Sequence, residues 1–183
     1  MMPLLVAILF CSFTLASALP TSQARDHLTT QEEELIRDAQ ILDQRIEIFI
    51  KAAERRWLAL NGVDEVAAKQ IKKDAEKWGE LPAGSRAELV RDLAKILDEA
   101  ITNIDDVSSH DERNPLIPKA LRRLAAVTNV LINRLKPLHA QAKSESELAS
   151  FEDLFENAES ILEAANKLPP PTDNKEKAKS KSN

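Results

Sequence analysis

The spacing of apolar residues in the second half of the chain is the feature that most constrains its fold. Between positions 117 and 138 a series with steps of three and four, apolar except for its threonine, consists of Ile117, Leu121, Leu124, Thr128, Leu131, Leu135 and Leu138. Such steps place side chains on one face of an α-helix, whereas a half-buried strand alternates at every second residue. This face is shielded from water only when other helices cover it, so the segment predicts a helical bundle.

Four further segments carry similar spacing, separated by breaks rich in glycine or proline. We expect helices at about residues 29–61, 64–78, 85–107, 115–138 and 144–168. Ser85 with Glu88, and Ser144 with Glu147, have the spacing of capping boxes, which begin helices. The sequence therefore predicts an all-α fold, an antiparallel up-and-down bundle of four long helices plus one short helix. A long coiled-coil dimer is the alternative, but the short breaks favour a chain that folds back on itself.

Two features interrupt the regular pattern. In the first expected helix, the apolar face that includes Ala53 and Leu60 should continue at position 56. That position holds Arg56, and the apolar side chain is on the next residue, Trp57. In the fourth expected helix, Pro137 removes one backbone hydrogen bond. We expect the helix to bend about one turn before this proline.

The N-terminus has the features of a signal peptide. Residues 1–19 have no charged side chain, and the apolar run at 4–15 is shorter than the ~20 residues that span a bilayer. We expect cleavage after Ala18; the alternatives are an uncleaved segment and a lipid anchor on Cys11, which the large Phe10 before it disfavours. The expected regions are a cleaved signal peptide at 1–18, a flexible lead-in at 19–28, a single helical-bundle domain at 29–168 and a disordered Pro/Lys-rich tail at 169–183.

The chain that remains after this cleavage lacks the residues that much catalytic chemistry requires. It contains no Cys, Met or Tyr, and therefore no disulfide, thiol nucleophile or Cys-rich metal site. Its glycines stand apart, and it has no Glu-x-x-His or Gly-x-Ser-x-Gly motif. We assign no catalytic, cofactor-binding or metal-binding residue and expect that the protein is not an enzyme. The alternative is a site of Asp, Glu, His and Arg side chains assembled between helices.

An acidic cluster before the fourth expected helix is the strongest candidate for a metal site. Its members are Asp105, Asp106, His110, Asp111 and Glu112. Carboxylate oxygens and imidazole bind divalent cations, but the cluster has neither the spacing nor the glycine of a calcium-binding loop. We favour a solvated turn between two helices.

The remaining candidate residues have structural interpretations. His139 is expected on the surface near a helix end, and His27 in the unstructured lead-in. Trp57 and Trp78 are expected to pack in the core or at its rim, the alternative being a ligand pocket or partner surface. A solvent-exposed helix face is expected to carry Glu47, Lys51, Glu54, Arg55 and Arg56.

The stretch LDQRIEIFIKAAERRWLAL at residues 42–60 resembles a segment of uncharacterised exported helical proteins of bacteria. The resemblance covers one helix and implies a bacterial envelope compartment, with no known activity, cofactor or catalytic residue.

The net charge of −5 disfavours nucleic acid and anionic membrane surfaces as main partners. We therefore expect an exported protein, periplasmic or extracellular, that acts by contact with other macromolecules as an adaptor, a holdase-like protein or a structural protein. A protein partner is expected, and self-association is compatible with the sequence. The alternative is a carrier that holds a lipid or another apolar small molecule between its helices.

Overall fold

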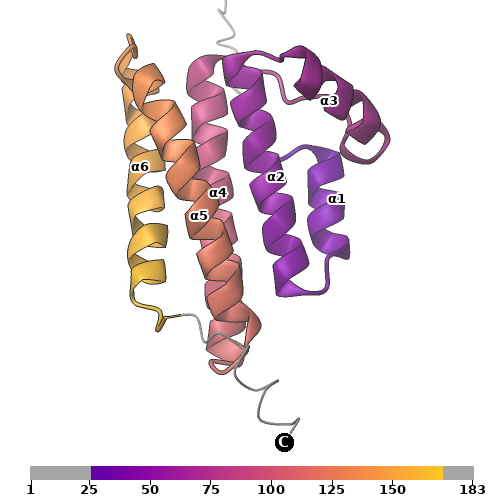
Figure 1. Ribbon diagram of the computed structural model, residues 1–183. Coiled ribbons are helices and arrows are strands. Elements are labelled where there is room, and N and C mark those ends of the chain that lie inside the picture. The colour runs from indigo at the N-terminus through magenta and orange to yellow at the C-terminus, as the bar shows by residue number, and fades with distance from the viewer. Residues whose placement is uncertain (1–25, 171–183) are drawn as a thin grey trace, which may run out of the picture.

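The computed structural model of the chain describes residues 26–170, where all regular secondary structure is α-helical (Figure 1). The helices are α1 (Thr30–Asp38), α2 (Leu42–Asn61), α3 (Glu65–Trp78), α4 (Arg86–His110), α5 (Leu116–His139) and α6 (Glu145–Asn166). The all-α prediction is confirmed for this part of the chain. None of its helices is long and apolar enough to cross a membrane. The predicted signal peptide, its cleavage site and residues 171–183 of the predicted tail lie outside the described residues.

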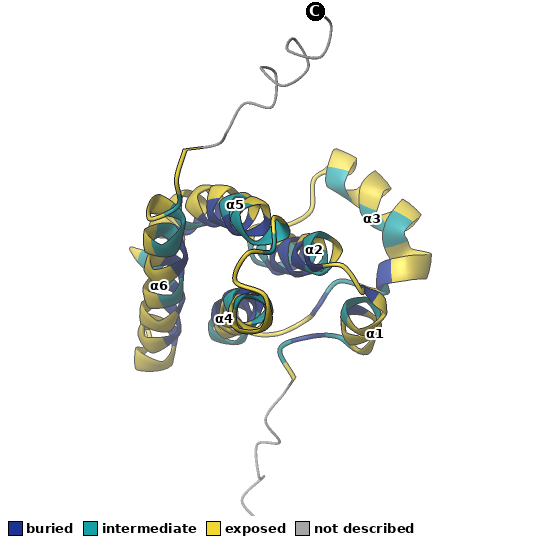
Figure 2. Cartoon of the chain, turned by 90° about the horizontal axis from the view of Figure 1, so that it is seen from below, coloured by how far each residue is buried: buried dark blue, intermediate teal, exposed yellow. Residues whose placement is uncertain are grey.

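The four long helices pack around one core, with α4 against α6 and α2, and α5 against α6 and α2 (Figure 2). Helices α2 and α5 begin at the same end of the molecule, where Lys119 pairs with Asp43. Helices α4 and α6 begin at the opposite end, where Arg86 pairs with Glu147. Chain direction thus alternates along the sequence, while the neighbours α4 and α6 run parallel to each other (Figure 1).

The expected first helix is two helices, which corrects the predicted number from five to six. The backbone is extended at Ala39 and Ile41, so α1 turns back beside α2. Arg45 stabilises the break, because its guanidinium donates to the Ala39 carbonyl from two nitrogens, at 3.2 and 3.0 Å. A third nitrogen donates to Asn103 of α4 at 2.9 Å. Ala39 and Leu42 are both buried, so the apolar spacing continues across the break and conceals it.

The helix starts follow the capping signals with one exception. Both hydrogen bonds of a capping box are present at the starts of α1 and α4, where the capping residues are Thr29 and Ser85. At α6 the Ser144 hydroxyl accepts from the Glu147 backbone N–H, but the predicted reciprocal bond is absent. The Glu147 carboxylate instead accepts from the Lys143 backbone N–H at 3.1 Å and from Arg86 of α4.

The predicted apolar stripes of the long helices form the core, and the stripe of the short helix does not. The largest fully buried apolar side chains are Ile46, Phe49, Leu93, Ile96, Ile104, Leu124, Leu135, Phe151, Leu154 and Ile161. Trp78 is the only buried residue of α3. Ala75 in the same helix is exposed, and so is Val63, which lies just before the helix begins. The reason is position: α3 packs chiefly on the small helix α1, away from the core (Figure 2).

Helix α5 continues past Pro137 to His139. The bend expected before this proline stays a prediction.

Candidate functional site

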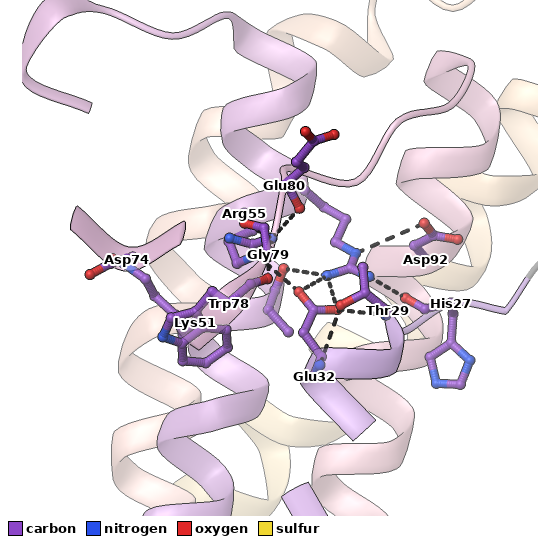
Figure 3. Close-up of polar contacts among 12 residues, drawn as sticks. His27, Thr29, Glu32, Lys51, Arg55, Asp74, Trp78, Gly79, Glu80 and Asp92 are labelled. Carbon is purple, nitrogen blue, oxygen red and sulfur yellow. Dashed lines mark hydrogen bonds and ion pairs between the residues drawn. The ribbon is translucent and has the colours of Figure 1, made fainter. Parts of the chain in front are cut away.

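A cluster of buried charges lies where α1, α2, α4 and the segment after α3 meet (Figure 3). Arg55 and Arg56 on α2 are 2% and 1% exposed, and Glu32 on α1 is 0% exposed. Asp92 on α4 completes the cluster at 4% exposed. The expected solvent-exposed face is therefore wrong for both arginines.

Glu32 is the central anion of the cluster, because both arginines donate hydrogen bonds to it. Its Oε1 accepts from Arg55 Nε at 3.0 Å, and Arg56 donates one nitrogen to both of its oxygens, at 2.5 and 2.6 Å. Glu32 Oε2 also accepts from the Thr29 backbone N–H at 2.9 Å, so the helix cap and the ion pairs share one carboxylate. Asp92 Oδ2 lies 3.9 Å from Arg56 Nε. Two cations and two anions balance, as burial of charges requires.

The Nη2 nitrogen of each arginine donates to backbone carbonyls of other segments. Arg55 donates to the carbonyls of Trp78 and Glu80 at 2.9 and 2.5 Å. Gly79 between them has φ +66°, a conformation that turns the chain and is rarely adopted by other residues. Arg56 donates to the His27 carbonyl at 2.6 Å. The cluster thus anchors the N-terminal segment and the α3–α4 connection to α2, which is a structural role.

His27 is ordered, which corrects its expected place in an unstructured lead-in. Its Nε2 lies 2.7 Å from Glu99 Oε2 on α4, and its side chain is 22% exposed. This contact fixes the chain entering α1 against α4.

The candidate metal cluster is a surface feature at the end of α4. Asp105, Asp106, His110, Asp111 and Glu112 are all exposed. The His110 Nδ1 lies 2.7 Å from the Asp106 carbonyl, one turn earlier in the same helix. Nowhere in residues 26–170 do three or more His, Cys, Asp or Glu side chains form a group that could hold a metal ion.

His139 and the two tryptophans contact different parts of the fold. The His139 ring is half-buried, and its centroid lies 5.2 and 5.1 Å from those of Phe151 and Phe155 on α6. Trp78 is buried, with the Arg55 guanidinium 5.8 Å from its centroid. Trp57 faces α5 and lies in an open groove.

The groove that contains Trp57 runs between α2 and α5 and has a volume of about 260 Å³. Its lining residues are Ala53, Glu54, Trp57, Arg123, Ala126, Val127, Val130, Leu131 and Arg134. Val130 is 47% exposed, although it is an apolar residue next to a tryptophan. The groove therefore presents an apolar floor to solvent.

The two arginines of this groove have different surroundings. Arg123 binds Glu47 through two hydrogen bonds of 2.6 and 3.0 Å. These bonds raise the pKa of Arg123 above its usual value. Arg134 lies 5.9 Å from the Trp57 ring centroid and has no carboxylate within ion-pair distance among the residues described. Arg134 is therefore a cation beside an apolar floor with no anion paired to it.

A second groove lies between α5 and α6 and has a volume of about 360 Å³. Its apolar lining consists of Ile132, Phe155, Ala158 and Leu162. Charged side chains also line it, Lys136 from α5 and Glu159 and Glu163 from α6. The two grooves flank α5 on both sides.

The sequence contains a signal for the α2–α5 groove, which lies outside the predicted apolar stripe of α5. Ala126, Val127 and Val130 are apolar and lie outside the buried seam of α5.

No protein-family profile, curated protein or solved structure matches the chain.

Proposed function

We propose that the protein is an exported up-and-down helical bundle that acts by contact with another macromolecule. The partner contacts the groove between α2 and α5, and the protein works as an adaptor or holdase-like protein in the periplasm or outside the cell. The observation that carries this proposal is the apolar floor of that groove, open to solvent beside the unpaired Arg134. The proposal assigns no catalytic role to any residue.

The groove fits an amphipathic helix with an acidic residue near its apolar face. Two parallel ridges with an apolar floor are the surface on which such helices dock. A large apolar side chain of the partner would replace water over Trp57 and Val130. A carboxylate beside it would meet Arg134, whose planar guanidinium can bind both carboxylate oxygens.

The alternative, a carrier for a lipid or another apolar small molecule, has weaker support. Carrier sites usually bury most of the ligand surface in a cavity of about 300–1,000 Å³. The grooves of about 260 and 360 Å³ are at the lower end of this range and are open along one side. A protein partner needs no such enclosure.

Site-specific crosslinking in the producing cell tests the proposal. A photoreactive amino acid replaces Val130 in one variant and Val66 on α3 in the control variant, where the valine is even more exposed, at 77% against 47%. We expect a discrete adduct from position 130 that Arg134→Glu abolishes, and no such adduct from position 66. Equal adducts from both positions, or an adduct that Arg134→Glu leaves unchanged, would count against this groove as the contact site.

A further inference from the structure

Acidic and basic residues are segregated between the two neighbouring helices α5 and α6. Between residues 116 and 139 there is no Asp or Glu, and the cations are Lys119, Arg122, Arg123, Arg134 and Lys136. Between residues 145 and 166 there is no Lys or Arg, and the anions are Glu145, Glu147, Glu152, Asp153, Glu156, Glu159 and Glu163. Because α5 and α6 pack side by side, one face of the molecule has a basic half and an acidic half.

On α5, Lys119 and Arg123 pair with Asp43 and Glu47 of α2. Arg122 and Lys136 form no ion pair within the described residues and instead donate to the Pro169 carbonyl and to Asn133. Of the α6 carboxylates only Glu147 forms an ion pair in the part of the chain that the structure describes, with Arg86 of α4. The other six are exposed. Lys136 and Glu159 line the same groove without pairing, and the Lys136 ammonium donates to Asn133 at 3.1 Å. The face therefore has complementary charges available for a partner of the same pattern.

We propose that two copies of this chain associate through their α5–α6 faces, related by a twofold axis parallel to the helices. Closed twofold symmetry is the commonest arrangement for identical chains and requires a self-complementary surface. Rotation about an axis along the helices places α5 of one copy opposite α6 of the other, twice. Basic helices then face acidic helices on both sides of the interface.

The charge pattern also favours this axis over the other twofold axis that would bring the same two faces together. A twofold axis in the same plane but perpendicular to the helices would place α5 opposite α5 and α6 opposite α6. Juxtaposed like charges oppose association, and Glu159 and Glu163, which line the α5–α6 groove, would then face the acidic α6 of the second copy. The parallel axis keeps each residue at its own height along the bundle. Lys136 of one copy therefore lies level with Glu159 of the other, because both line one groove.

The face has the apolar centre and the size that a weak dimer needs. The half-buried Phe155 and Leu162 lie between the charged edges, where the second copy would cover them. A helix of 22 residues such as α6 is about 33 Å long, and two packed helices are about 20 Å wide. The interface would bury about 1,300 Å² over both copies, which is at the lower end for specific association.

Sedimentation velocity on the purified chain, with charge reversals, tests the proposal. The first variant, Arg122→Glu with Lys136→Glu, reverses two cations of α5, and the second, Glu159→Lys with Glu163→Lys, reverses two carboxylates of α6. The control, Lys72→Glu with Lys73→Glu, reverses two exposed charges on α3. All variants keep the same N-terminal segment, so association through that segment would not respond to the reversals.

We expect the wild type and the α3 control to form dimers at about 100 μM, where an interface with a micromolar Kd is occupied. Each of the first two variants alone should dimerise about tenfold more weakly or worse, since repeated like-charge contacts replace attractive ones. Their equimolar mixture should form heterodimers, because both helix contacts are again between opposite charges. Higher salt should weaken the wild-type dimer and the heterodimer alike.

Three results would overturn the inference. The first is a monomeric wild type at this concentration in low salt, and the second is a dimer as tight in both reversed variants as in the wild type. The third is the absence of a heterodimer in the mixture, provided that each variant retains the helical circular dichroism of the wild type. The wild-type and salt measurements decide the question even if a reversed variant fails to fold. Failure here would leave the α2–α5 groove untouched, since none of the altered residues lines it.

Discussion

Replacing Glu32 by glutamine should destabilise the fold strongly, although it removes only one negative charge. Glu32 is 0% exposed and accepts hydrogen bonds from two buried arginines. The glutamine amide oxygen can still accept from the Thr29 backbone N–H, but its NH₂ group would face the Arg56 donors. The two cations would be left with Asp92, 3.9 Å from Arg56, as the remaining anion of the cluster.

The size of the effect follows from the burial of the cluster. Removing one partner of a buried ion pair costs about 3–5 kcal/mol, because the other charge stays buried without compensation. For a domain whose free energy of unfolding is about 5–15 kcal/mol, this is a large fraction of the total. At this chain length it corresponds to a fall in Tm of roughly 6–20 °C.

Urea unfolding followed by far-ultraviolet circular dichroism measures the loss. Glu33→Gln is the matched control, because Glu33 lies in the same first turn of α1 and is exposed. The control should change the free energy of unfolding by less than about 0.5 kcal/mol. In combination with Arg56→Met, Glu32→Gln should cost less than the sum of the two single changes, since the two residues share the interaction that is lost. If Glu32→Gln and Glu33→Gln differ by less than about 0.5 kcal/mol, the buried cluster does not hold α1 as described.

Three further predictions concern the helix ends. Gly62→Ala should destabilise by about 1–3 kcal/mol in urea unfolding, because φ +86° and ψ 160° strain any other residue, although an added Cβ would meet no atom within 4 Å; Gly84→Ala, where φ is not positive, should cost much less. Ser85→Ala should cost about 1 kcal/mol by removing the α4 capping box, and no change in Tm would contradict this. The pKa of Glu147 is lowered, chiefly because its carboxylate accepts a hydrogen bond from Arg86, while burial acts in the opposite direction. Its contribution to stability is therefore complete above the unfolded pKa of about 4.3 and lost as the pH falls through the folded value. Glu147→Gln should flatten the fall in Tm between about pH 5 and pH 3, and an unchanged slope would refute the pairing.

The apolar spacing was sufficient to predict the helical segments and the core of the long helices, but not the break between α1 and α2. Steps of three and four along α5 place Leu124 and Leu135 in the core, as expected. The capping signals at Ser85 and Ser144 mark their helix starts because they act within one turn. These features depend on neighbours close in sequence, which a pattern reports directly.

The buried charges could not be predicted in the same way, because their partners come from distant segments. Arg56 occupies a position that continues the apolar seam, yet its charge led to the expectation of a solvent-exposed side chain. Its anion Glu32 reaches it only because the chain turns back after α1, and that turn depends on the contact of Arg45 with Asn103 across the bundle. Likewise, α3 has a helical stripe like the others, yet it packs chiefly on α1 and leaves most of the stripe uncovered.

The buried cluster and the α2–α5 groove are linked through the rotation of α2. Arg55, Arg56 and Trp57 are consecutive, so their side chains point in directions about 100° apart around the helix. The two arginines bind Glu32 and backbone carbonyls of other segments, and a helix held by two adjacent side chains cannot turn about its axis without breaking those bonds. Trp57 is thereby directed toward α5 and the Arg134 guanidinium. The buried charges on α2 thus determine that Trp57 faces the solvent-exposed groove.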